Sequence, residues 1–81
     1  MTAFATIDDI TKLWRPMTVG EQARAASLLE VVSASLRTEA DKVGKDLDKM
    51  VSASAAYAEV ARSVTVDVVA RTLMTATDQE P

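Results

Sequence analysis

The hydrophobic positions of the chain recur mainly at intervals of three and four residues, which is the period of an amphipathic α-helix. We predict a first helix over residues 7–14, because Thr6 is a good N-cap and Pro16 disfavours helical backbone before it. Acidic residues in the first turn of this helix suit the helix dipole. They are Asp8 and Asp9, and the apolar stripe is Ile7, Ile10, Leu13 and Trp14.

A second, longer helix is predicted from Thr18 to Gly44. Thr18 and Glu21 form a T-x-x-E capping box, and Gly44 is a natural C-cap glycine. One face of this helix is apolar: Ala25, Leu28, Leu29, Val32, Leu36, Ala40 and Val43. Residues 45–50 then read as a turn or a short helix. Its apolar anchors could fold back onto the second helix: Leu47, Met50 and Val51.

A third long segment, residues 54–74, carries two apolar stripes. The first is Tyr57, Val60, Ala61, Val64 and Val68, and the second is Val66, Val69 and Leu73. Such a wide apolar surface predicts a central helix that the other two cover. Residues 64–68 also alternate with a period of two and are rich in β-branched side chains, a pattern typical of a strand. The alanine-rich flanks favour the helix. Residues 75–81 are polar and acidic and read as a frayed tail.

These elements predict an all-α fold, a small bundle of three long-to-short helices with a possible short fourth helix and a polar C-terminal tail. The 81 residues form a single domain, with residues 1–5 and 76–81 expected to be flexible. A monomer of 8.7 kDa should expose about 4,700 Å². Its core supports marginal stability, so a packing partner would help.

Composition restricts the chemistry. The chain has no cysteine and no histidine, which excludes disulfides, thiolate zinc sites, imidazole ligands and a Ser-His-Asp triad. No phosphate-binding, nucleotide-binding or hydrolase motif occurs. Asp41, Asp46 and Asp48 cluster, but lysines interleave them and the calcium-loop spacing is missing. We therefore expect no enzymatic activity, no catalytic residues, no cofactor, no metal and no small-molecule ligand.

The formal net charge is −3, and the basic residues are scattered among acidic ones rather than gathered on one face. This distribution favours a solvated surface over a nucleic-acid footprint. Neither a signal peptide nor a membrane span is expected. Trp and Arg are enriched at interface hot spots, and an ion pair on an apolar helix can serve a subunit contact. The candidate protein-interface residues are Trp14, Arg15, Arg24, Arg37, Asp67 and Arg71.

Two parts of the chain resemble a known family. They are residues 3–39, with Phe4-Ala-Thr-Ile-Asp-Asp-Ile10, Leu13-Trp-Arg-Pro-Met-Thr18, Glu21, Arg24-Ala25, Leu28-Leu-Glu30 and Leu36-Arg37, and residues 60–74, with Val66-Asp-Val-Val-Ala-Arg-Thr-Leu73. The pattern is similar to the head–tail connector family of tailed bacteriophages, also called adaptor or head-completion proteins. Val31 and Val32 depart from the usual acidic-Ala pair. The family tends to continue into a Gly-rich segment, whereas this sequence stops at Pro81, which leaves a missing C-terminal segment open.

The resemblance implies a structural virion protein at the head–tail joint, present in the host cytoplasm before assembly. It implies a homo-oligomeric ring that docks on the portal protein, meets a downstream connector or tail-completion protein and extends the channel through which DNA passes. The alternative is a small helical regulatory or antitoxin-like binding module, favoured by the short first helix that is followed closely by a second. Its net charge and the lack of a basic recognition helix count against it.

Overall fold

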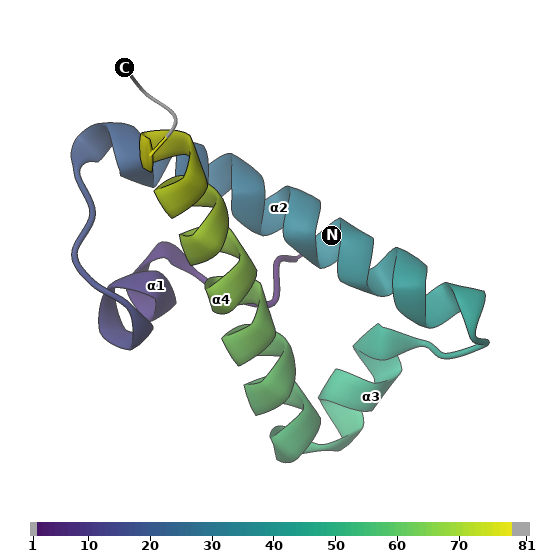
Figure 1. Ribbon diagram of the computed structural model, residues 1–81. Helices are drawn as coiled ribbons and strands as arrows, with labels where there is room; N and C mark the ends of the chain where they lie inside the picture. The colour runs from purple at the N-terminus through teal and green to yellow at the C-terminus, as the bar shows by residue number, and fades with distance from the viewer. Residues whose placement is uncertain (1, 79–81) are drawn as a thin grey trace.

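The computed structural model describes residues 2–78 as four helices joined by short connections (Figure 1). They are α1 Ile7–Leu13, α2 Val19–Lys42, α3 Leu47–Ala53 and α4 Ala55–Asp78. The described residues contain no strand, so the prediction of a small all-α bundle is confirmed. Residues 64–68, which alternate like a strand, lie inside α4. The short element after Gly44 is a helix that contacts α2, and its apolar anchors are half-buried.

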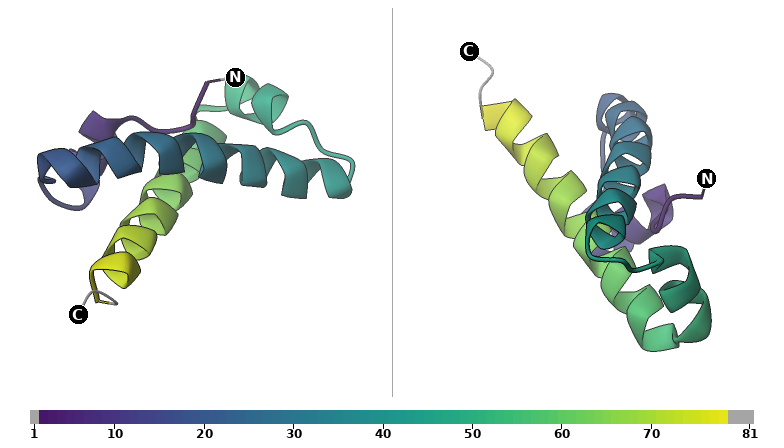
Figure 2. Two further views of the ribbon diagram at one scale, coloured as in Figure 1. Left: turned by 90° about the horizontal axis from the view of Figure 1, so that it is seen from above. Right: turned by 90° about the vertical axis from the view of Figure 1, so that its right-hand side faces the viewer.

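Helix α4 contacts all three other helices and crosses α2, while α1 and α3 lie on one side of α2 (Figure 2). The resulting shape is elongated, with extents of 43 × 24 × 17 Å. The radius of gyration is 13.2 Å, whereas a compact domain of this length has about 12 Å. The bundle is therefore more elongated than a compact domain of this length.

Tertiary packing selects which apolar positions become the core. Ile10 of α1 and Val69 of α4 are fully buried, and Leu73 is 1% exposed. The main cluster is Ala5, Ile10, Met17, Ala25, Leu29, Val32, Val66, Val69 and Leu73. Leu13 and Val43, which the periodicity places on buried stripes, lie at the ends of α1 and α2 and are instead 58% and 71% exposed.

The helix ends follow the capping signals of the sequence. Thr18 and Glu21 exchange hydrogen bonds in the predicted box, with Glu21 N–H to Thr18 Oγ1 at 3.1 Å and Thr18 N–H to Glu21 Oε1 at 3.0 Å. Thr6 forms the same box with Asp9. Gly44 follows the C-cap Val43 with φ of +75°, a conformation that glycine adopts without steric cost. Its N–H donates to the Asp41 carbonyl at 3.0 Å, so the α2 end is a Schellman motif.

Helix α4 corrects two predictions. It contacts the other helices as a central element, but only one of its apolar stripes is covered. Ala61 of the first stripe is buried, but its other members are between 39% and 59% exposed, on the side of α4 away from the core: Tyr57, Val60, Val64 and Val68. The helix also continues to Asp78, so the frayed tail predicted from residue 75 is helical as far as the described residues extend.

The segment before α1 is packed against α2. Ala5 is 4% exposed, and the Phe4 N–H donates to the buried Ser33 hydroxyl oxygen at 3.0 Å. Flexibility of residues 1–5 stays a prediction, and Met1 and residues 79–81 lie outside the described residues. All buried side-chain nitrogen and oxygen atoms of the described residues have hydrogen-bond partners. Because Ala5 is buried and Phe4 is hydrogen-bonded to Ser33, the segment before α1 is part of the packed fold.

Candidate functional site

The junction between α1 and α2 brings together Trp14, Arg15 and Glu21. Pro16 prevents α1 from continuing, so the chain turns here and Arg15 lies beside the start of α2. The Arg15 guanidinium lies 4.0 Å from the centre of the Trp14 ring. Its Nη1 and Nη2 atoms donate to the Glu21 carboxylate at 3.0 and 2.9 Å, and Nη1 also donates to the Pro16 carbonyl. Trp14 and Arg15, which are neighbours in the sequence, thus have their side chains in direct contact.

Glu21 serves this junction and the helix cap at once. Its carboxylate accepts from Arg15 and from the Thr18 backbone, and its side chain is 19% exposed. The hydrogen bonds from Arg15, followed by that from Thr18, lower the pKa of Glu21 to about 2. The same hydrogen bonds with Glu21 raise the pKa of Arg15 above its ordinary value. Both groups are therefore charged across the physiological range and hold the turn.

Arg37 forms a second cluster near the C-terminal part of α2. Its guanidinium binds Asp48 of α3 through Nε and Nη2 at 2.9–3.1 Å and lies 4.3 Å from the centre of the Phe4 ring. Nη2 also donates to the Thr2 carbonyl. The hydrogen bonds from Arg37 lower the pKa of Asp48. The Arg37 side chain is only 13% exposed, so its surface is largely used by intramolecular contacts.

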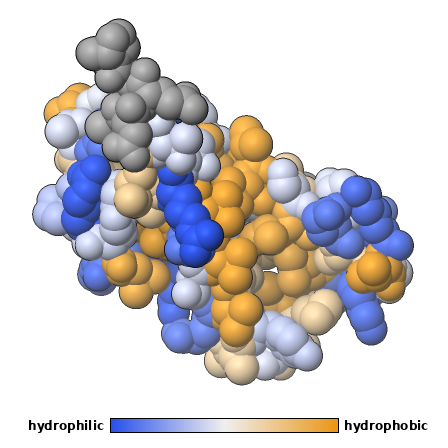
Figure 3. Space-filling model, in the orientation of Figure 1, coloured by the Kyte–Doolittle hydropathy of each residue, from blue (hydrophilic) through white to orange (hydrophobic). Residues whose placement is uncertain are grey.

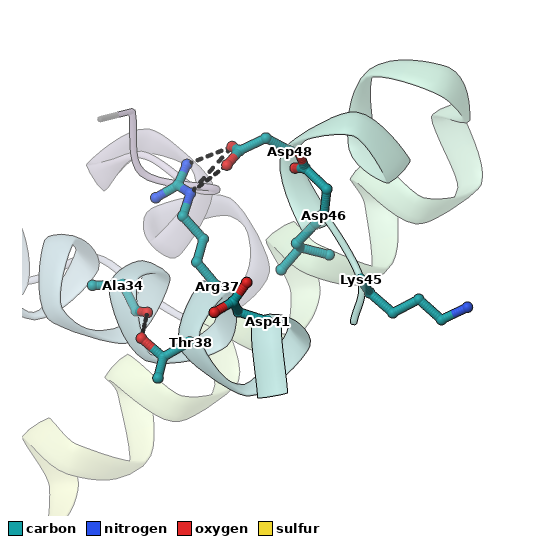
Figure 4. Close-up of a pocket in the computed structure, with 8 residues that line it drawn as sticks. Ala34, Arg37, Thr38, Asp41, Lys45, Asp46 and Asp48 are labelled. Atoms are coloured by element: carbon teal, nitrogen blue, oxygen red, sulfur yellow. Dashed lines mark hydrogen bonds and ion pairs between the residues drawn. The ribbon is translucent and has the colours of Figure 1, made fainter. Parts of the chain in front are cut away.

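A shallow hollow of about 500 Å³ separates the end of α2 from the start of α3, and Figure 4 shows the polar side chains that line it. Two of its three carboxylates have structural partners. Asp46 accepts the Lys49 N–H as the N-cap of α3, and Asp48 binds Arg37. Among residues 2–78 no group of three or more acidic side chains is placed to hold a metal ion. The contacts of Asp46 and Asp48 in this hollow are structural.

The remaining candidates lie apart from both clusters. Arg24 is exposed on α2, and no hydrogen bond or ion pair involves it within the described part of the chain. Asp67 and Arg71 form an exposed i,i+4 ion pair on α4 at 3.1 Å. The six predicted interface residues therefore do not converge on one site. They occupy the α1–α2 junction, two positions on α2 and the outer side of α4.

The structure adds features that the sequence did not indicate. Phe4 and Asp48 are distant in sequence from Arg37, so no local spacing predicts their contact. The exposed stripe of α4 is one of the two apolar stripes visible in the sequence, but the periodicity gives no sign of which stripe stays uncovered. The arrangement offers surfaces for protein contact, and no helix within residues 2–78 is long and apolar enough to cross a membrane.

Comparisons with known proteins match one family. Residues 13–81 match the family described as phage protein Gp19/Gp15/Gp42. The match includes the Trp14–Glu21 junction, Arg37 and all of α4, and it begins after most of α1. No curated protein and no solved structure matches the chain.

Proposed function

The chain belongs to the phage protein family Gp19/Gp15/Gp42, and we propose that it is a structural protein of the virion at the joint between head and tail. The match over residues 13–81 carries this proposal. The resemblance of residues 3–39 and 60–74 to head–tail connectors gives the finer role. Copies form a ring that docks on the portal protein and offers a platform for a downstream connector or tail-completion protein.

The charge of the chain suits a channel wall. With a net charge of −3, and with Arg15 and Arg37 paired to carboxylates within the chain, the surface offers DNA few phosphate contacts. Phosphate contacts supply most non-specific DNA affinity, so a wall poor in free cations lets DNA pass without holding it. In this role the chain acts by shape and assembly rather than by catalysis, first in the host cytoplasm and then in the virion.

Electron microscopy of purified virions tests the proposal. We expect a ring of density below the portal that accommodates the four helices with the α2–α4 crossing as described. A stop codon early in the reading frame should yield DNA-filled heads that do not join tails, and supply of the intact chain from a plasmid should restore joining. Density at the head–tail joint that cannot hold this chain would contradict the proposal.

A gel shift on duplex DNA separates the proposal from the regulatory alternative. We expect no retardation at about 100 mM salt, because Arg15 and Arg37 are engaged within the chain. Among the described residues only three basic side chains have no hydrogen-bond or ion-pair partner: Arg24, Lys45 and Lys49. Retardation that weakens steeply as salt rises would show a phosphate-binding surface and favour a regulator.

A further inference from the structure

The outer side of α4 presents an apolar face to solvent. Tyr57, Val60, Val64 and Val68 follow one another at spacings of three, four and four residues, so they share one face of the helix. Their exposed fractions are 51%, 59%, 40% and 39%. Figure 3 shows hydrophobic side chains gathered over the lower part of α4 and in the angle between α4, α2 and α3. Four consecutive exposed positions on one face are a surface patch rather than scattered apolar residues.

The chain exposes more surface area than a compact monomer of its mass. The chain exposes 5420 Å², about 700 Å² more than a monomer of this mass ordinarily does. A standard protein interface removes about 800 Å² from each partner. The excess is thus of the size that one neighbouring subunit would cover.

The charges around the apolar face are balanced. Asp67 and Arg71 follow Val60 and Val64 at helical spacing and pair with each other, so the outer side of α4 up to Met74 has no net charge. The Glu59–Arg62 pair lies instead on the side of the buried Val66. The chain as a whole carries −3. An outer side without net charge does not repel another copy of the chain, and it offers no attraction to a strongly charged partner such as DNA.

The opposite side of the molecule offers a complementary surface. On α2 the positions diametrically opposite Ala25, Leu29 and Val32 are exposed, uncharged and small or β-branched. They are Gly20, Ala23, Ser27, Val31, Ala34 and Thr38. A shallow hollow at the edge of this face is lined by Val31, Ala34, Ser35, Thr38 and Glu39. Small side chains let the backbone of a second helix approach, so this face accommodates the larger side chains of α4.

We propose that the apolar face of α4 in one copy packs on the outer face of α2 in the next copy. Because α2 and α4 bury their inner faces between them, their outer faces point to opposite sides of the molecule. The contact therefore joins two different surfaces, and such a head-to-tail contact repeats from copy to copy until it closes. The inference rests on the proposed function for the ring, and it names the surfaces that hold the ring together.

Single cysteines test the contact, because the chain contains no cysteine of its own. V60C mixed with V31C and a short bismaleimide should give a cross-linked dimer, and the double variant should give a ladder of higher oligomers. V60C mixed with V43C is the control, since Val43 is also an exposed valine of the α2 end but lies off the proposed face. The experiment uses the full chain at up to about 1 mM and lysates in which virions assemble.

The outcomes separate the possibilities. At least a tenfold excess of the V60C–V31C product over the V60C–V43C product supports the proposal, and V64D should abolish it while helicity is unchanged. Cross-links in V60C alone would show that the α4 face pairs with itself, and this overturns the head-to-tail contact. Equal or absent products in both samples also overturn it. Virion incorporation of the chain, measured separately, tests the proposed function, so either can fail alone.

Discussion

The first 42 residues and helix α4 are held in place by different means. Up to the end of α2, polar contacts fix the turns: Thr6 with Asp9, Thr18 with Glu21, and the Phe4 backbone with Ser33. In α4 the ion pairs and threonine hydrogen bonds run within the helix itself, as in the Thr65 hydroxyl donating to Ala61. Local polar contacts thus fix the turns of the N-terminal region, whereas the position of α4 depends on the packing of its apolar surface against the other helices.

Truncation of the buried face of α4 should have the largest effect. Leu73 is 1% exposed in the main core, so L73A removes packed methyl groups and leaves a cavity. We expect the free energy of unfolding to fall by about 2–5 kcal/mol, a large part of the stability of a domain this small. Urea unfolding followed by circular dichroism measures it.

Val60 provides the matched control on the outer face of the same helix. It is 59% exposed, and V60A should change the stability of the monomer by no more than about 0.5 kcal/mol. A large loss in V60A at low protein concentration would show that the outer face is covered within the chain, and the contrast between the two faces would be wrong.

Removal of a polar contact in the N-terminal region should have an intermediate effect. Ser33 is fully buried and accepts the Phe4 N–H, so S33A leaves that donor without its partner. We expect a loss of about 1–3 kcal/mol. Ser35 is exposed on the same helix, so S35A should change the stability by no more than about 0.5 kcal/mol. Equal losses in the two variants would contradict a stabilising role of the Phe4–Ser33 hydrogen bond.

Acid should weaken the N-terminal region by the smallest amount. The pKa of Glu21 is about 2 in the folded chain and near 4.5 when unperturbed, so its contribution is complete above about pH 4.5 and is lost as the pH falls toward 2. Chemical unfolding between pH 7 and pH 2.5 measures this change. E21Q keeps a capping side chain without the charge, and its stability should fall less over the same interval. If stability fell equally with pH in the unmodified chain and in E21Q, the pH dependence could not be assigned to Glu21.

The same contrast explains what the sequence could predict. Thr18, Glu21 and Gly44 act on residues within a few positions, so the ends of α2 follow from local spacing. The contact of Arg37 with Phe4 and Asp48 joins residues up to 44 positions apart and has no local signal. Periodicity likewise identifies two apolar stripes on α4 but not which one faces the core. The fold class was therefore predictable, whereas the arrangement of the candidate surfaces was not.

Arg37 has a consequence for the ends of the fold. Its guanidinium contacts the Thr2 carbonyl, the Phe4 ring and the Asp48 carboxylate. This one side chain of α2 therefore connects the opening segment with α3. A tag or fusion that displaces the first residues would therefore loosen a corner more than forty positions away. For any experiment that needs the native corner between α2 and α3, the C-terminus is the end to extend.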